Sequence, residues 1–113
     1  MKTKELSVRH PYFVLLKSGE KQVEGRLYDD FFRDLSKKDV LIFVDEDNGE
    51  KLKMEIEKID VFDDFNKMIR FIGKTILGFA KFSDEETLKT YNSFYSMEEI
   101  KEKGVCGVSV RKI

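Results

Sequence analysis

The chain is poor in the residues that form cross-links and bind metals. Its 113 residues include one cysteine, Cys106, and one histidine, His10. A single cysteine excludes an internal disulfide, and with one histidine it cannot supply the four ligands of a structural zinc site. We therefore predict that the protein binds no metal, and no motif along the chain indicates a cofactor.

Long apolar stretches are also missing. No apolar run approaches the roughly 18 residues that mark a membrane-spanning helix, and the N-terminus lacks the apolar core of a signal peptide. Tryptophan is absent and proline occurs once, yet ten Phe and four Tyr contribute to a hydrophobic fraction of 41%. This composition suffices for one hydrophobic core. We expect residues 1–113 to form a single soluble, cytoplasmic domain that is monomeric and does not contact a membrane.

The chain has no marked excess of either charge. Charged residues make up 38% of it, but the net charge is -1 and the isoelectric point is about 5.9. These values exclude a strongly basic surface that follows a nucleic-acid backbone over a long distance. Any contact with RNA must therefore be local, with a modest affinity that falls as salt is added.

The pattern of apolar residues predicts five or six strands. The run from Val40 to Val44 contains only β-forming apolar residues, which is typical of a buried strand. Asn48-Gly49 is a hairpin signal. The return strand alternates from Leu52 to Ile56 and then changes phase, which predicts a bulge near Lys58. The other predicted strands lie at about residues 5–8, 21–28 and 106–110.

Start and stop signals predict three or four short helices. Pro11, the only proline, suits the first position of a helix that Gly19 ends. Apolar residues between Phe65 and Ile72 recur with helical spacing. Two further helices are predicted by the capping boxes Ser83 with Glu86 and Ser96 with Glu99.

The order of these elements indicates the fold class. Strands and helices do not alternate as regular βαβ units, and the segment 74–82 is interpreted as a loop around Gly78. We therefore predict a mainly β, α+β fold: a small, strongly bent, mostly antiparallel sheet or barrel with peripheral helices.

The most informative segment is Gly19-Glu20-Lys21-Gln22-Val23-Glu24-Gly25-Arg26. On a strand, Glu24 and Arg26 share one face and can form an ion pair, whereas Val23, Gly25 and Leu27 face the core. Lys21 joins them only if the strand begins after it or contains a bulge. Three such groups within six residues indicate a cleft for an anion or a nucleotide. The simpler alternatives are an exposed lysine and a salt bridge that holds the strand.

The pattern G-x-K-x-x-E-x-R resembles the signature of the ASCH domain, a small relative of the PUA RNA-binding fold. The longer segment Val23–Asp29 is similar to that of small stand-alone archaeal ASCH proteins. Phe94-Tyr95, Glu98-Glu99 and Gly104-Val105 follow in the order found in that branch, so the resemblance covers nearly the whole chain. It implies a PUA-like bent-sheet pseudo-barrel, and RNA or a nucleotide-like ligand as the partner.

The resemblance also implies roles for individual residues. Lys21 and Arg26 would contact the anion and Glu24 would orient them, beside the first helix. The other positions expected to bind the ligand are Gly19, Tyr28, Arg33 and Gly78. Tyr28 is equally suited to cover the edge of the core, and Arg33 is also typical of a solvated helix. A helical stripe of Leu88, Tyr91, Phe94 and Tyr95 is interpreted as core packing.

A second function stays open on the same residues. One enzymatic group of ASCH proteins removes acetyl groups from modified cytidine with a Lys, a Thr three residues later and a distant Glu. Lys21 matches that lysine, but Glu24 occupies the position of the threonine. In a hydrolase of this kind, or in a ribonuclease, Lys21 and Glu24 would be the catalytic residues, with Lys21 as the base. A protein-interaction domain is a third alternative. Cys106 alternates with valines and is interpreted as a buried thiol, not a nucleophile.

Overall fold

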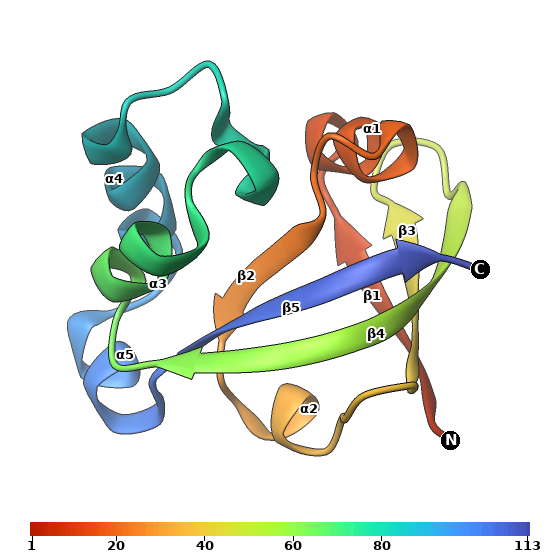
Figure 1. Ribbon diagram of the computed structural model, residues 1–113, viewed down its shortest axis with the longest axis horizontal. Helices are drawn as coiled ribbons and strands as arrows, with labels where there is room; N and C mark the ends of the chain where they lie inside the picture. The colour runs from red at the N-terminus through yellow and green to blue at the C-terminus, as the bar shows by residue number, and fades with distance from the viewer.

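A five-stranded sheet, curled into a half-barrel, forms the centre of the computed structural model, which describes residues 1–113 (Figure 1). Six helices surround it. The strands are β1 (Thr3–Val8), β2 (Val23–Leu27), β3 (Val40–Asp45), β4 (Lys51–Phe62) and β5 (Val105–Lys112). The helices are α1 (His10–Ser18), α2 (Asp30–Arg33), α3 (Phe65–Ile72), the π-helix η1 (Thr75–Phe79), α4 (Asp84–Phe94) and α5 (Met97–Lys103).

The strand order is β1-β3-β4-β5-β2, so β1 and β2 form the two edges of the sheet. The pair β1–β3 is parallel and the other three pairs are antiparallel. The predicted α+β class and the strongly bent, mostly antiparallel sheet are therefore confirmed. The parallel pair was not predicted. It is possible because α1, β2 and α2 separate the two strands in the sequence and form a long enough crossover.

Strand β4 carries the predicted bulge. Its register with β5 shifts between Ile56 and Lys58, so Glu57 is the extra residue. Met54 and Ile56 before the shift and Ile59 after it pack against the same core. If Glu57 occupied a regular position of the strand, the alternation would turn Ile59 to the opposite face. The bulge thus keeps both halves of the strand in phase with the core.

The sheet separates two hydrophobic cores. One lies inside the half-barrel and includes Phe13 of α1 and Phe32 of α2. The other lies between the outer face of the sheet and the layer of α3, η1, α4 and α5, which stands beside β2 (Figure 1). Strand β2 contributes Val23 and Leu27 to this second core. Its opposite face, with Glu24 and Arg26, therefore turns toward the open side of the half-barrel.

Local signals set most helix ends as predicted. Gly19 ends α1 in the left-handed region, at φ 91°, where a residue with a Cβ is strained. Pro11 lies in the first turn of α1, one residue after the helix begins. Helix α3 spans the predicted residues, and both predicted capping boxes are present, at the starts of α4 and α5.

Two short helices differ from the sequence prediction. Helix α2 lies outside the segments predicted as helices, although Arg33 at its end is typical of a solvated helix. The π-helix η1 lies in segment 74–82, which was predicted as a loop. Within η1, Gly78 adopts φ 95°, and the main-chain oxygen of Ile76 accepts a hydrogen bond from Gln22 at 2.8 Å. This contact from a distant segment holds η1, and no local pattern encodes it. No helix of the protein has the length and apolarity needed to cross a membrane.

Candidate functional site

Lys21 and Glu24 come together because strand β2 begins only at Val23. Helix α1 ends at Gly19, and the N–H of Lys21 then donates to the main-chain oxygen of Leu15 at 3.0 Å. This turn leaves Lys21 before the strand, and its ammonium lies 3.1 Å from the Glu24 carboxylate. Of the two geometries predicted for this pairing, the structure has the late strand start.

The ammonium of Lys21 is buried, with 2% of the residue exposed. It donates to the main-chain oxygens of Val23 at 2.9 Å and Leu77 at 2.7 Å. With Glu24 as the third partner, all three N–H groups of the ammonium are engaged. Burial lowers the pKa of Lys21, and the negative charge of Glu24 acts in the opposite direction. Lys21 is therefore a buried cation whose charge is balanced by Glu24 and whose hydrogen bonds are all made to protein groups.

Glu24 is the central residue of the cluster. Its second carboxylate oxygen accepts from Nε of Arg26 at 2.5 Å. Burial by itself raises the pKa of Glu24, but the charges of Lys21 and Arg26 outweigh burial and leave this pKa below its ordinary value. The carboxylate is therefore ionised at neutral pH, and the three side chains together carry one net positive charge.

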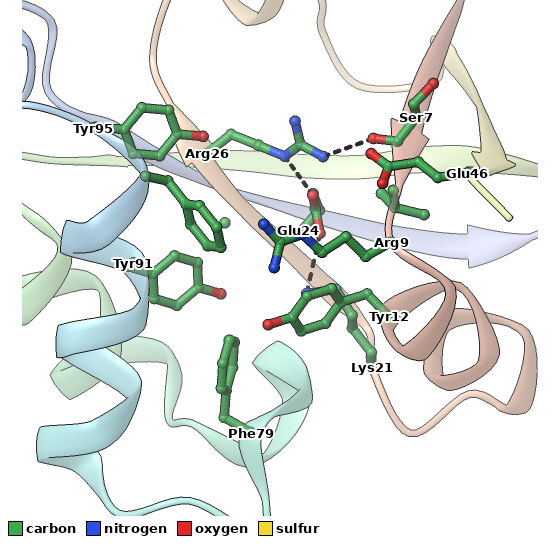
Figure 2. A pocket seen from close by; sticks show the side chains of 13 residues that line it. Ser7, Arg9, Tyr12, Lys21, Glu24, Arg26, Glu46, Phe79, Tyr91 and Tyr95 are labelled. Carbon is green, nitrogen blue, oxygen red and sulfur yellow. Dashed lines mark hydrogen bonds and ion pairs between the residues drawn. The ribbon is translucent and has the colours of Figure 1, made fainter.

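Arg26 reaches from this buried pair to the surface of the cavity. A second nitrogen, Nη2, donates to the main-chain oxygen of Ser7 on β1 at 3.1 Å (Figure 2). A guanidinium has five N–H groups, and the bonds to Glu24 and Ser7 use two of them. About a quarter of the side chain is exposed. The remaining N–H groups are therefore available to an anion or a base edge.

These residues line one side of a cavity of about 220 Å³. Figure 2 shows it between strand β2, the junction of β1 and α1, helix α4 and η1. Aromatic side chains form most of the remaining wall, and the guanidinium of Arg9 lies 5.1 Å from the ring centroid of Phe94 at the rim. The lining residues are Ser7, Val8, Arg9, Tyr12, Lys21, Glu24, Gly25, Arg26, Glu46, Phe79, Tyr91, Phe94 and Tyr95.

Tyr91 brings an unpaired hydroxyl group to this cavity. The residue is 4% exposed, and its hydroxyl oxygen has no hydrogen-bond partner. Burial raises the pKa of Tyr91 well above 10, so the hydroxyl stays protonated. Figure 2 shows the hydroxyls of Tyr12 and Tyr91 pointing toward the middle of the cavity from opposite sides. The cavity therefore offers polar groups between apolar walls, an arrangement typical of small-molecule sites.

The predicted site residues fall into two places. Lys21, Glu24 and Arg26 form the cluster described above. Gly78 lies behind it, where an added Cβ would come within 3.1 Å of the Lys21 stem, while Gly19 only ends α1. Tyr28 and Arg33 lie in a separate surface groove along α5. There the guanidinium of Arg33 lies 4.4 Å from the Tyr28 ring centroid and donates to the main-chain oxygens of Tyr28 and Lys103.

Several lining residues escaped the sequence analysis. No local pattern marks Arg9, and the stripe along α4 to Tyr95 is typical of core packing. That interpretation fits Tyr91, which belongs to the second core, but Phe94 is 44% exposed at the rim of the cavity. Helical spacing shows that these rings share a face without showing what that face meets. Cys106 is buried, and burial raises the pKa of its thiol to about 12, so it is not poised as a nucleophile.

One group of side chains has donor atoms close enough to share a cation. Atoms of His10, Asp45 and Asp47 lie within 4.8 Å of one another. The carboxylate of Asp45 already pairs with Nδ1 of His10 at 2.6 Å and accepts from the N–H of Asp47 at 2.9 Å. These bonds attach the start of α1 to the turn between β3 and β4. The cluster is therefore accounted for as a structural tie.

Comparisons with known proteins give a consistent result. A model of the ASCH domain family matches residues 6–106. The crystal structure of hypothetical protein PH0355 is similar, with 34% identity, a TM-score of 0.88 and 100% of both chains covered. The solution NMR structure of protein PF0455 from Pyrococcus furiosus has 30% identity and a TM-score of 0.81, covering 98% of this chain and 97% of that one. A comparison with curated proteins finds no match.

Proposed function

We propose that this chain, which belongs to the ASCH domain family, binds RNA or a nucleotide-like ligand in the cavity beside β2. The observation that carries the proposal is the guanidinium of Arg26. Glu24 and Ser7 fix its orientation, while its other N–H groups have no protein partner. A fixed, partly exposed guanidinium is suited to a phosphate or to the edge of a base, because its planar fork donates two parallel hydrogen bonds.

The charges around the cavity support an anionic ligand. Arg9, Lys21 and Arg26 are cationic and Glu24 and Glu46 are anionic, so the lining carries an excess of one positive charge on a chain with a net charge of -1. The aromatic walls provide surfaces on which a base can stack. A local site of this kind predicts modest affinity and a weak dependence on salt.

Lys21 contributes to this site indirectly. All its donors are engaged by protein atoms, so a phosphate would have to displace one of them. Its role in the proposal is to balance the buried charge of Glu24, which in turn positions Arg26. Direct contact with the anion is assigned to Arg26 and to Arg9 at the rim.

The test measures RNA binding as a function of salt. Fluorescence anisotropy with labelled single-stranded RNA 12-mers, from 50 to 300 mM KCl, gives the slope of log affinity against log salt. Arg9→Gln should weaken binding and reduce the slope by about 0.7, the value for one phosphate contact on a single strand. Arg70→Gln is the matched control, because Arg70 is exposed on α3 outside the cavity. The proposal fails if wild type binds neither RNA nor nucleotides, or if both variants weaken binding equally.

One observation favours a second candidate, hydrolysis of a modified nucleoside. Burial lowers the pKa of Lys21, as a general base requires, and Glu24 lies within 3.1 Å of it. The full set of partners around the ammonium favours its charged form and argues against that role. Release of acetate from N4-acetylcytidine, measured with wild type and with Lys21→Met, separates the two functions. Turnover that Lys21→Met abolishes supports the hydrolase. Binding without turnover supports a domain that only binds its ligand.

A further inference from the structure

We infer that Gly25 and Tyr91 read the hydrogen-bonding edge of a single unstacked base at the inner wall of this cavity. The inference rests on the proposed function, because it names the part of the ligand that enters the cavity. It is carried by the main-chain groups of Gly25 on the free edge of β2 and by the unpaired hydroxyl of Tyr91, neither of which the Lys21–Glu24–Arg26 cluster uses.

Strand β2 exposes main-chain groups on one side only. The main-chain oxygen of Gln22 accepts from Val110, and the N–H of Tyr28 donates to Gly104, each at 3.0 Å. The even-numbered residues of β2 therefore direct their main-chain groups toward β5. Because main-chain groups alternate along an antiparallel edge strand, Val23 and Gly25 direct theirs away from the sheet. The oxygen of Val23 is taken by Lys21, whereas Gly25 lines the cavity with one donor and one acceptor.

Gly25 also fixes how closely Tyr91 approaches this edge. A Cβ at Gly25 would lie 2.8 Å from the Tyr91 hydroxyl and 2.8 Å from the terminal methyl of Met68. Only glycine therefore allows the hydroxyl to lie against the strand. A buried hydroxyl without a partner destabilises the free protein. A ligand that offers it a partner recovers this loss, so binding and the unpaired group are coupled.

The groups that converge here match the edge of a base. The Watson–Crick edge of every base carries a donor beside an acceptor, and Gly25 supplies one of each. The hydroxyl of Tyr91 can donate or accept. In a duplex the Watson–Crick edge is taken by the partner base, so the ligand is an unpaired base. Arg9 and Arg26 line the same cavity, so they are the cations available to the phosphate on the sugar of that nucleotide.

The size of the cavity agrees with one base. Its volume of about 220 Å³ is below the roughly 300–1,000 Å³ of sites that enclose drug-sized ligands. A single base with part of its sugar suits this space, and a second stacked base does not. A short single-stranded RNA would therefore place one base inside and leave its neighbours outside the rim.

The test uses Tyr91→Phe with Tyr28→Phe as the matched control, because Tyr28 lies in the separate groove along α5. Isothermal titration measures affinities for the four nucleoside 5′-monophosphates, for ribose 5-phosphate and for single-stranded RNA tetramers. Tyr91→Phe should weaken binding of at least one nucleotide about five- to tenfold and leave ribose 5-phosphate unchanged. Its thermal midpoint should equal or exceed that of wild type, because the unpaired hydroxyl is gone. Tyr28→Phe should change no affinity.

The outcomes separate this inference from the proposed function. If wild type binds neither RNA nor nucleotides, both fail. If nucleotides bind and Tyr91→Phe leaves every affinity unchanged, or weakens ribose 5-phosphate equally, the inference alone is overturned. With the expected loss in Tyr91→Phe, tighter binding of the tetramers than of the mononucleotides identifies RNA as the ligand, and equal binding identifies a free nucleotide.

Discussion

Arg26 and Ser7 join the two edges of the sheet. The hydrogen bond from Nη2 of Arg26 on β2 to the main-chain oxygen of Ser7 on β1, at 3.1 Å, crosses the open side of the half-barrel. The same guanidinium holds Glu24 and faces the cavity. One side chain thus helps to close the fold and presents the candidate contact for a ligand, so stability and binding are linked at this position.

Arg26→Lys should lower the free energy of unfolding by about 1–2 kcal/mol, because an ammonium cannot reproduce the planar fork that reaches both Glu24 and Ser7. Urea unfolding measures the change, and hydrogen exchange should be faster in the amides of β1. Arg70→Lys, at an exposed position on α3, should leave stability within about 0.5 kcal/mol of wild type. Equal stability of wild type and Arg26→Lys would show that the bond to Ser7 has no structural role.

Removing one partner of the buried Lys21–Glu24 pair should strongly lower the free energy of unfolding. Both residues are 5% exposed or less, and removing one partner of a buried pair leaves an uncompensated charge, at a cost of about 3–5 kcal/mol. We expect losses of this order for Lys21→Met, and smaller ones for Glu24→Gln. The double variant should lose less than the sum of the two. A double-mutant cycle from denaturant unfolding measures the coupling, and strict additivity would contradict it.

Gly78→Ala should destabilise the protein more than Gly19→Ala. Both glycines have φ near 90°, so both substitutions carry the strain of a left-handed residue, about 1–3 kcal/mol. Only at Gly78 does the new methyl group meet another atom, within 3.1 Å of the Lys21 stem, whereas nothing lies within 4 Å at Gly19. Thermal unfolding of the two variants isolates that contact. If the two midpoints coincide, Gly78 is not needed to seat Lys21.

The His10–Asp45 pair should stabilise the protein within a limited pH range. The hydrogen bond to Asp45 raises the pKa of His10 above 6.5. A histidine whose pKa is higher in the folded than in the unfolded protein stabilises the fold fully at pH values below its unfolded-state pKa. This stabilisation is lost as pH rises through its folded-state pKa. Burial acts to raise the pKa of Asp45, but His10 and main-chain N–H groups hold it below 3.8. The stabilisation is therefore also lost as pH falls through the folded pKa of Asp45.

The measurement is urea unfolding of wild type and His10→Gln between pH 5 and 9. The difference in stability should be largest near pH 5–6 and should shrink as pH rises. An NMR titration of the His10 ring gives the folded pKa directly. A stability difference that is constant over this range, or a ring pKa at or below its ordinary value, would exclude a charged pair.

Sequence patterns predicted those parts of the structure that depend on neighbours along the chain. Gly19 stops a helix because only glycine adopts its φ without strain, and Ser83 and Ser96 cap helices through residues three positions away. The order of apolar residues itself shows where the alternation of β4 changes phase, around Lys58. The grouping of Lys21, Glu24 and Arg26 was accessible for the same reason, since all three lie within six residues.

The rest of the site depends on contacts between distant segments. Arg9 and Phe94 meet across the rim although they lie 85 positions apart in the sequence, and no alternation or helical spacing encodes which surface a helix will face. The π-helix η1 was not predicted for a related reason: its main chain is held by Gln22 and by the Lys21 ammonium, which lie far from it in the sequence. The unpaired hydroxyl of Tyr91 follows from packing against Gly25, which becomes visible only once α4 is placed beside β2.

The bulge in β4 makes one residue of this strand dispensable for the direction of its side chains. Glu57 is the extra residue between Ile56, which pairs with Val110, and Lys58, which pairs with Ser109. Deleting Glu57 would leave an unbroken alternation, with Ile56 and Ile59 still on the core side. What the extra residue adds is a local bend and a stronger twist, so a deletion of this single codon would straighten β4 and keep the same side chains dry.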